Sequence, residues 1–230
     1  MRYHSDDHEA PRGSRPGGRH TAIAASWLGL ALALLIAGCG SGAAADRTPA
    51  TGGYYGAMLS KPLAKPDFTL TDTRGQPFHF KAATQGYVTL LYFGYTNCPD
   101  VCPVHMANIA AVLKEHPDLR DHIKVVFVTT DPARDSLPQL RAWLDNFDST
   151  FVGLRGPIDE VNRIQASLNL PPAEKEPGGK NGDYGVGHSA EVIAFTPDNL
   201  AHLVYPFGVR QSGWAADLPR LVHDKAWGAE

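Results

Sequence analysis

The sequence has little cysteine and no excess of charge of either sign. Only 3 of its 230 residues are cysteines, whereas a secreted scaffold held together by disulfides needs about four or more in a shorter chain. Its 21 Lys and Arg residues nearly balance 24 Asp and Glu residues. Nucleic-acid binding usually shows as clustered positive charge. We therefore expect neither a disulfide scaffold nor a nucleic-acid partner.

The overall composition is that of an ordinary globular protein. With 43% hydrophobic and 20% charged residues, the chain is too apolar to be disordered throughout. The sequence contains no internal repeat. We expect one folded domain, a monomer, with additional segments at the N-terminus.

The first 38 residues have the pattern of an export signal. A polar segment with several arginines precedes an uncharged apolar run over 21–37, as an n-region precedes an h-region. This run is shorter than the ~20 residues that span a bilayer, and it leads into Ile36-Ala37-Gly38-Cys39, which resembles a bacterial lipobox. We predict a lipoprotein signal peptide over 1–38 and a diacylglyceryl group on Cys39. The alternative is an uncleaved N-terminal membrane anchor.

The remaining chain divides into a tether and a domain. Residues 39–60 are rich in Gly, Ala, Ser and Thr, which predicts a flexible tether with little to bury. Residues 61–230 are long enough for one hydrophobic core. Either reading of the N-terminus places this domain outside the cytoplasm. We predict that it is anchored to the outer face of the bacterial cell membrane.

The domain has the pattern of an α/β protein. Two nearly continuous apolar runs, 88–93 and 123–130, predict parallel strands buried on both faces. Amphipathic helices are expected over 104–114, 137–147, 158–168 and 215–226, with β-hairpins over 68–80 and 190–205. The long stretch 171–187 is predicted as an irregular loop. This order predicts a thioredoxin-like fold, a central mixed sheet flanked by helices with an N-terminal β-hairpin.

Two cysteines lie at the turn between the first buried strand and its helix. Cys98 and Cys102 are separated by three residues, so in a helical turn they face the same way with Cα atoms about 6 Å apart. Two such thiols can share a metal ion, and the same distance permits a disulfide. The helix N-terminus should lower the pKa of at least one thiol. Spacing alone leaves open metal binding, redox exchange and a plain structural disulfide.

One histidine and one aspartate are candidates to join this pair. His188 precedes the second hairpin, and if that hairpin's first strand is antiparallel to its neighbours, its start lies at the edge of the sheet where the parallel strands end. Asp131 leaves the second buried strand at that edge, where it could accept a hydrogen bond or orient a ligand. Turn formation and helix capping by Asp135 or Ser136 explain that segment equally well. His105, one helical turn beyond Cys102, is expected to point elsewhere.

Three motifs together make the chain resemble the SCO/SenC family of copper-binding assembly proteins for cytochrome c oxidase. They are 94–103 (GYTNCPDVCP), 128–135 (VTTDPARD) and 186–189 (VGHS). The resemblance implies a thioredoxin fold and assigns Cys98, Cys102 and His188 as copper ligands. It also implies delivery of copper, or of reducing equivalents, to the binuclear copper site of oxidase subunit II. Gly187 departs from the pattern, because many relatives carry an acidic residue there.

The donor chemistry agrees with this resemblance. Thiolates are soft ligands that select Cu(I), and imidazole suits both Cu(I) and Cu(II). Zinc accepts the same ligands, but copper stands higher in the Irving–Williams order. Two functions remain open: a membrane-tethered copper metallochaperone, which is not an enzyme, and a thiol-disulfide oxidoreductase in which Cys98 and Cys102 form the redox-active pair. His188 discriminates between them, because a disulfide reductase does not need it.

Overall fold

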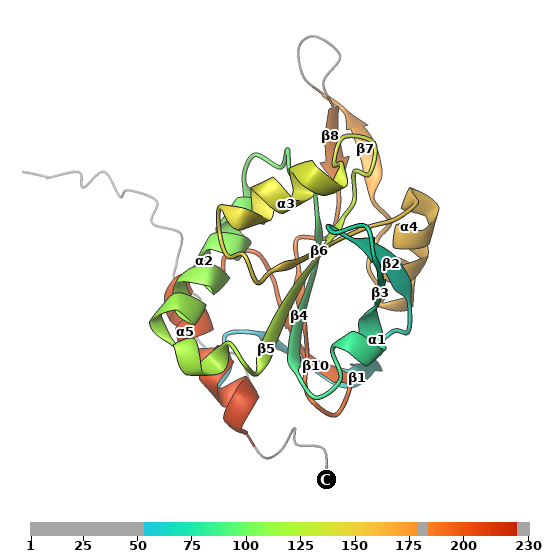
Figure 1. Cartoon of the computed structure of the whole chain (residues 1–230). Helices are drawn as coiled ribbons and strands as arrows, with labels where there is room; N and C mark the ends of the chain where they lie inside the picture. Colours follow the sequence, from blue (N-terminus) through green and yellow to red (C-terminus); the bar gives the residue numbers. More distant parts are fainter. Residues whose placement is uncertain (1–52, 179–183, 225–230) are drawn as a thin grey trace, which may run out of the picture. The chain divides into compact units, whose positions relative to one another are not determined.

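An eight-stranded mixed sheet runs through the domain, with helices on both of its faces (Figure 1). This computed structural model describes residues 53–178 and 184–224. The predicted signal peptide over 1–38, Cys39 and most of the predicted tether lie outside the described residues. Within the described ranges, none of the helices combines the length and apolar character that crossing a membrane requires.

The sheet confirms the predicted thioredoxin-like architecture. Neighbouring strands β4, β5 and β6 are parallel, whereas β9 is antiparallel to β4, and β2 and β3 form the expected N-terminal hairpin. In order across the sheet the strands are β1 (Ala57–Ala64), β10 (Leu200–Tyr205), β9 (Val192–Phe195), β4 (Val88–Gly94), β5 (Ile123–Thr129), β6 (Val152–Arg155), β2 (Thr69–Asp72) and β3 (Pro77–His79).

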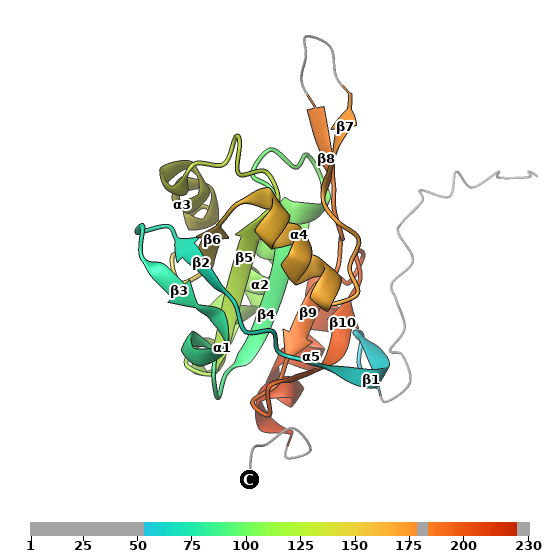
Figure 2. The ribbon, with the colours of Figure 1, turned by 90° about the vertical axis from the view of Figure 1, so that its right-hand side faces the viewer.

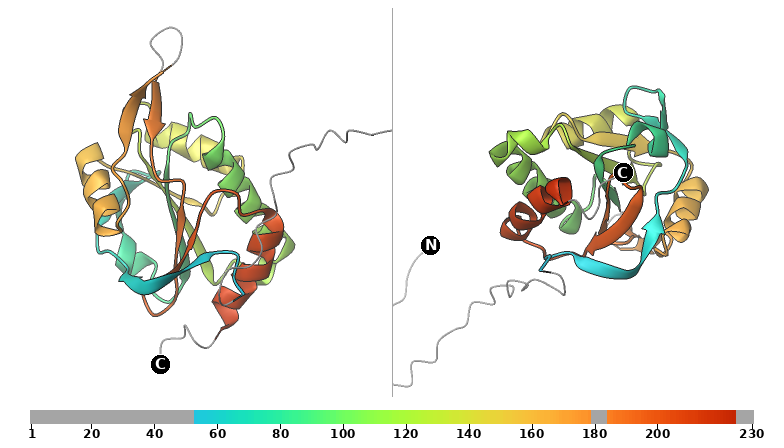
Figure 3. Two further views of the ribbon diagram at one scale, coloured as in Figure 1. Left: turned by 180° about the vertical axis from the view of Figure 1, so that it is seen from behind. Right: turned by 90° about the horizontal axis from the view of Figure 1, so that it is seen from below.

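Helices divide between the two faces and give the domain two cores. Every residue of β4 is buried, and because side chains alternate along a strand, Leu90 and Tyr92 enter one core while Leu91 and Phe93 enter the other. Figure 3 shows the two longest helices, α2 and α5, together on one side. The helices are α1 (Phe80–Ala83), α2 (Val101–Glu115), α3 (Leu137–Asp145), α4 (Ile158–Ser167) and α5 (Gln211–His223), with a 3-10 turn at Pro117–Leu119.

Three strands lie where the sequence predicted none. The long segment predicted as a loop forms a two-stranded hairpin, β7 (Glu174–Pro177) and β8 (Tyr184–Gly187), which projects beyond the main sheet (Figure 2). Strand β1 begins four residues inside the range predicted as tether. Both β1 and β7 are mostly exposed, so their sequences carry no apolar alternation, and backbone pairing with a neighbour defines them. The prediction of an irregular loop over 171–187 was therefore wrong for the residues that form β7 and β8.

Candidate metal centre

Three segments far apart in the sequence meet at the carboxyl edge of β4 and β5. Cys98 lies in the loop after β4, Cys102 lies in the first turn of α2, and His188 follows β8 directly. Strand β9 is antiparallel to β4, with Val192 opposite Tyr92, so the chain entering β9 passes the end of β4. The ligand atoms of Cys98, Cys102 and His188 lie within 4.8 Å of one another. The predicted convergence of these residues is confirmed.

A close approach of the backbone holds the cysteine loop against the sheet. A Cβ atom on Gly94 would lie 2.8 Å from Sγ of Cys102, too close for any side chain, so glycine is required at the end of β4. The N–H of Cys102 points to Sγ of Cys98 at 3.4 Å. Cys102 is fully buried, whereas Cys98 retains 8% exposure. The two thiols are both free and differ in their access to solvent.

The two thiols also differ in acidity. A hydrogen bond from Cys102 lowers the pKa of Cys98 to about 4, and His188 and the backbone N–H groups of Asp100 and Cys102 contribute, while burial opposes the shift. Burial raises the pKa of Cys102 well above its ordinary value. Tyr92 donates its hydroxyl to Sγ of Cys102 at 3.5 Å. Near neutral pH the pair therefore holds one thiolate, at Cys98, and one proton, at Cys102.

This asymmetry predicts an unusual pH dependence of alkylation. In the metal-free protein, Cys98 should react with iodoacetamide at a nearly constant rate from pH 8 down to about pH 5, because it is ionised above its pKa of about 4. Its rate should fall only as the pH passes below that value. Cys102 should remain slow throughout. Mass spectrometry of the modified peptides measures both rates, and a rate for Cys98 that falls tenfold per unit below pH 8 would contradict the assignment.

One imidazole nitrogen of His188 faces the sulfurs and the other is held by the backbone. Nδ1 donates to the carbonyl oxygen of Ser189 at 2.8 Å, which leaves the lone pair on Nε2, 3.5 Å from Sγ of Cys102. The rings of Tyr95 and Tyr92 lie edge-on to the imidazole, with centroids 5.6 and 6.0 Å away. A carbonyl bond that fixes the tautomer of a histidine is the usual second contact of a metal ligand.

These three donor atoms fit trigonal coordination, in which the metal ion lies in the plane of its three ligand atoms. Ligand atoms about 2.2 Å from a shared metal in trigonal geometry lie about 3.8 Å apart, and the three donors span at most 4.8 Å. Two sulfurs and one neutral imidazole form a soft donor set, which favours Cu(I) over the hard cations. Small movements of the side chains would therefore complete a three-coordinate site.

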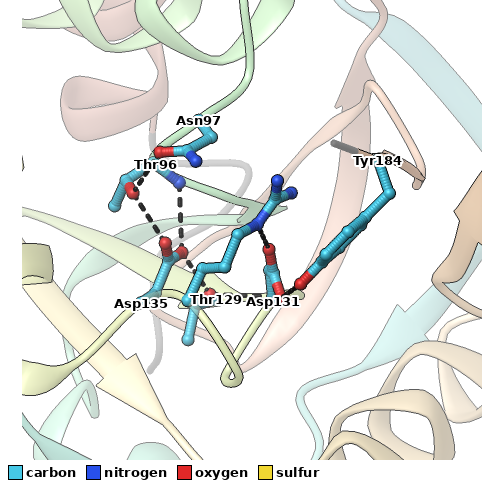
Figure 4. Close-up of polar contacts among 7 residues, drawn as sticks. Thr96, Asn97, Thr129, Asp131, Asp135 and Tyr184 are labelled. Atoms are coloured by element: carbon cyan, nitrogen blue, oxygen red, sulfur yellow. Dashed lines mark hydrogen bonds and ion pairs between the residues drawn. The ribbon is translucent and has the colours of Figure 1, made fainter. Parts of the chain in front are cut away.

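Asp131 contacts the hairpin that precedes His188. Its carboxylate accepts a hydrogen bond from the hydroxyl of Tyr184 in β8 at 2.9 Å and is paired with Nε of Arg134 (Figure 4). The guanidinium of Arg134 lies 3.7 Å from the centroid of the Tyr184 ring. Asp131 thus ties the loop after β5 to the base of β8. Its role in orienting a ligand stays a prediction, since the contacts described for its carboxylate are to Tyr184 and Arg134.

Asp135 holds the cysteine loop, a role that the sequence did not indicate. Its carboxylate accepts hydrogen bonds from the N–H and the hydroxyl of Thr96, at 3.0 and 2.6 Å, and from the hydroxyl of Thr129 at 2.5 Å (Figure 4). Asp135 is fully buried. The capping role belongs to Ser136, whose Oγ accepts from the N–H of Gln139. Asp135 therefore joins β5 to the chain two residues before Cys98.

Replacement of Asp135 by alanine should destabilise the domain and loosen this loop. The buried hydroxyl of Thr129 and two donors of the half-buried Thr96 would lose their acceptor, which we expect to reduce the free energy of unfolding by about 2–3 kcal/mol. Urea denaturation measures the loss. Asp145→Ala is the matched control, because Asp145 is 48% exposed at the end of α3 and forms a surface ion pair with Arg141, so it should cost less than about 0.5 kcal/mol. Equal losses in both variants would contradict the prediction.

A carboxylate lies beside Gly187 despite the glycine at that position. A Cβ atom on Gly187 would lie 2.5 Å from Oε1 of Glu176, which belongs to the facing strand β7. The space that a side chain at 187 would enter is therefore taken by Glu176. Glu176 of β7 thus places a carboxylate beside Gly187, the position before His188 at which many relatives carry an acidic residue.

Fold and site together define a class of protein: a thioredoxin-like domain with two thiols and one imidazole at the carboxyl edge of its sheet, placed to hold a soft metal ion. The chain belongs to the SCO1/SenC family, whose model matches residues 56–223. This confirms the resemblance drawn from the three motifs.

Individual relatives agree with this membership. A Stutzerimonas stutzeri protein is 32% identical over 173 residues, covering 73% of this chain and 81% of its own. The mouse mitochondrial SCO2 homologue is 31% identical over 147 residues, covering 63% of this chain and 56% of its own. This chain spans about half the length of the mitochondrial SCO2 relatives that it matches.

Solved structures confirm the fold. Copper-bound ScoI of Bradyrhizobium japonicum superposes with a TM-score of 0.60 at 33% identity, covering 69% of this chain and 99% of that one. Copper-bound yeast Sco1 superposes with a TM-score of 0.62 at 26% identity, covering 73% and 91%.

Proposed function

We propose that this protein is a membrane-tethered, extracytoplasmic copper metallochaperone that delivers copper to the binuclear copper site of cytochrome c oxidase subunit II. The observation that carries the proposal is the convergence of Cys98, Cys102 and His188 within 4.8 Å. Membership of the SCO1/SenC family and the copper bound in the two solved relatives support it. Copper is here the cargo of the protein.

The geometry suits a site that must take up and release its metal. Three protein donors leave copper short of a closed four-coordinate site, so an incoming ligand from an acceptor protein can bind before a chain ligand leaves. His188 is half-buried, and Cys98 keeps 8% exposure. In Cu(II), a water or an acceptor oxygen can complete the coordination, which permits both oxidation states at one site.

Copper titration and transfer test the proposal directly. The reduced protein should bind one equivalent of Cu(I) in competition with a chelator. When the loaded protein is mixed with the metal-free copper domain of oxidase subunit II, copper should appear in that domain, with the absorption of its binuclear site as the readout. Absence of tight binding, or binding without any transfer, would overturn the metallochaperone function.

A second function, thiol-disulfide oxidoreductase, is favoured by the unequal acidity of the two thiols. The Cys98 thiolate would attack one sulfur of a partner disulfide and release the other sulfur as a thiolate. Cys102 would then lose its proton and attack the mixed disulfide at Cys98, which releases the reduced partner. After this exchange the protein holds a Cys98–Cys102 disulfide. The two cysteines have supplied both of the electrons that reduced the partner disulfide.

The proposed location depends on Cys39, which lies outside the described residues. In a bacterial host the wild-type protein should fractionate with membranes and carry a lipid on the Cys39 sulfur. Cys39→Ala should accumulate as a precursor that is longer by the 38 signal residues, because lipidation precedes cleavage. Mass spectrometry of the membrane and soluble fractions measures both outcomes. A soluble wild-type protein with the same mass as the variant would contradict lipidation.

A further inference from the structure

His105 is buried beneath the metal centre, against the expectation from the sequence that it has no part there. It lies one turn beyond Cys102 in α2 and is 1% exposed. Its ring contacts those of Tyr92, Phe207 and Trp214, with centroids 5.2, 5.8 and 6.3 Å away. Its Nε2 lies 3.0 Å from the carbonyl oxygen of Ala190. Since a carbonyl only accepts, Nε2 is the donor.

This hydrogen bond reaches the segment that carries His188. Residues 188–191 connect β8 to β9 and belong to neither strand. Apart from the 3.5 Å contact of His188 Nε2 with Sγ of Cys102, the side-chain hydrogen bonds described for this segment are local: Nδ1 of His188 to the carbonyl of Ser189, and the hydroxyl of Ser189 to Glu191. The bond from His105 joins this segment to α2, the helix that also carries Cys102. One helix therefore positions the sulfur and, through His105, the backbone that aims the imidazole.

Stability alone does not explain a histidine at this position. Burial lowers the pKa of His105, so the ring is neutral at pH 7, and its Nδ1 is buried with no partner among the described residues. Enclosing an unpaired nitrogen among three aromatic rings is unfavourable. Phenylalanine would fill the same space without that cost, and water could reach the half-buried Ala190 in place of the imidazole. What histidine adds is a directed hydrogen bond.

We propose that His105 is a positioning residue for copper binding: its Nε2–H holds the carbonyl of Ala190 and thereby keeps Nε2 of His188 directed at the two sulfurs. This inference rests on the proposed function for its copper readout. Imidazole matters most for Cu(II), so loss of the positioning bond should affect Cu(II) more than Cu(I). Loss of an outer contact of this kind typically lowers metal affinity by about 10–100-fold.

Four variants of the whole protein test the proposal. His105→Phe keeps the aromatic packing and removes the donor, and His105→Leu removes the donor if the phenylalanine variant does not fold. His105→Gln retains an N–H donor at a similar reach. His202→Leu is the matched control, because it removes a histidine whose Nε2 pairs with Asp198 beside the hairpin turn between β9 and β10, away from the metal centre.

Two readouts separate positioning from general stability. In the metal-free protein, the backbone amides of residues 188–191 should exchange at least about tenfold faster in the His105→Phe variant, with β4 and β5 unchanged. The Cu(II) affinity of that variant should fall about tenfold or more, and its Cu(II) absorption should change. His105→Gln should restore both towards wild type, and His202→Leu should alter neither.

Three outcomes would overturn the positioning role. The first is that amide exchange and Cu(II) affinity are unchanged in the variants without a donor. The second is that His105→Gln loses as much amide protection and Cu(II) affinity as His105→Phe. The third is that His202→Leu loses as much as His105→Phe. If the wild-type protein binds no copper, the proposed function fails, and the amide exchange of the metal-free protein decides the role of His105 by itself.

Discussion

Cys98→Ser and Cys102→Ser should each lower the affinity for Cu(I) by more than about 100-fold, because Cu(I) prefers thiolate and a serine hydroxyl is a hard, neutral donor. One remaining thiolate and one imidazole do not complete the three-coordinate site that the geometry offers. The loss should be similar for both variants although one cysteine is fully buried and the other is not. Competition with a Cu(I) chelator of known affinity measures it.

The chain supplies a matched control for this result. Cys39 is the only other cysteine among the 3 in the sequence, and Cys39→Ser should leave the copper stoichiometry and affinity of the domain unchanged. Circular dichroism of the two site variants should resemble that of the wild type, because serine is close to cysteine in size. Wild-type affinity in either site variant would show that copper binds somewhere else.

His188→Ala should separate metal binding from thiol chemistry. The variant loses the single nitrogen donor that faces the sulfurs, so Cu(II) affinity should fall by about 100-fold or more and Cu(I) affinity by less. Disulfide exchange needs only a thiolate to attack and a second thiol to resolve. Cys98 and Cys102 should therefore still cycle between dithiol and disulfide, which titration with redox buffers measures.

The same variant decides between the two functions in cells. In a strain without the wild-type gene, His188→Ala should fail to restore oxidase activity when copper is limiting, if copper delivery is the function. Full restoration by His188→Ala, together with failure of both cysteine variants, would favour the reductase. Recovery of any variant on addition of copper alone would support metal supply.

Much of the fold was predictable because its central elements are buried on both faces. The apolar runs that became β4 and β5 indicated parallel strands, and the position of His188 at the start of the second hairpin placed it at the edge of the sheet. Topology then brought the histidine to the cysteines without any knowledge of distances, since a strand antiparallel to its neighbours must begin where they end.

What the sequence did not reveal depends on hydrogen bonds with partners far along the chain. Asp135 resembled a helix cap, and its bonds to Thr96 span 39 positions. His105 was expected to point away from the cysteines, and its bond to Ala190 spans 85 positions. Strand β7 is exposed along its whole length. A hydrogen bond between side chains far apart in the sequence leaves no periodic pattern. The backbone pairing of an exposed strand leaves none either.

The tight fit of Cys102 against Gly94 closes one side of the metal centre. Sγ of Cys102 is enclosed by the end of β4 behind it and by Tyr92 beside it, and no part of this residue is exposed. Cys98 retains some exposure, and His188 borders a hollow of about 580 Å³ that residues of β7 also line. In the proposed copper delivery, a donor or acceptor protein would therefore meet copper on the side of Cys98 and His188. Cys102 would then be the innermost ligand of the incoming ion and the last ligand to release it.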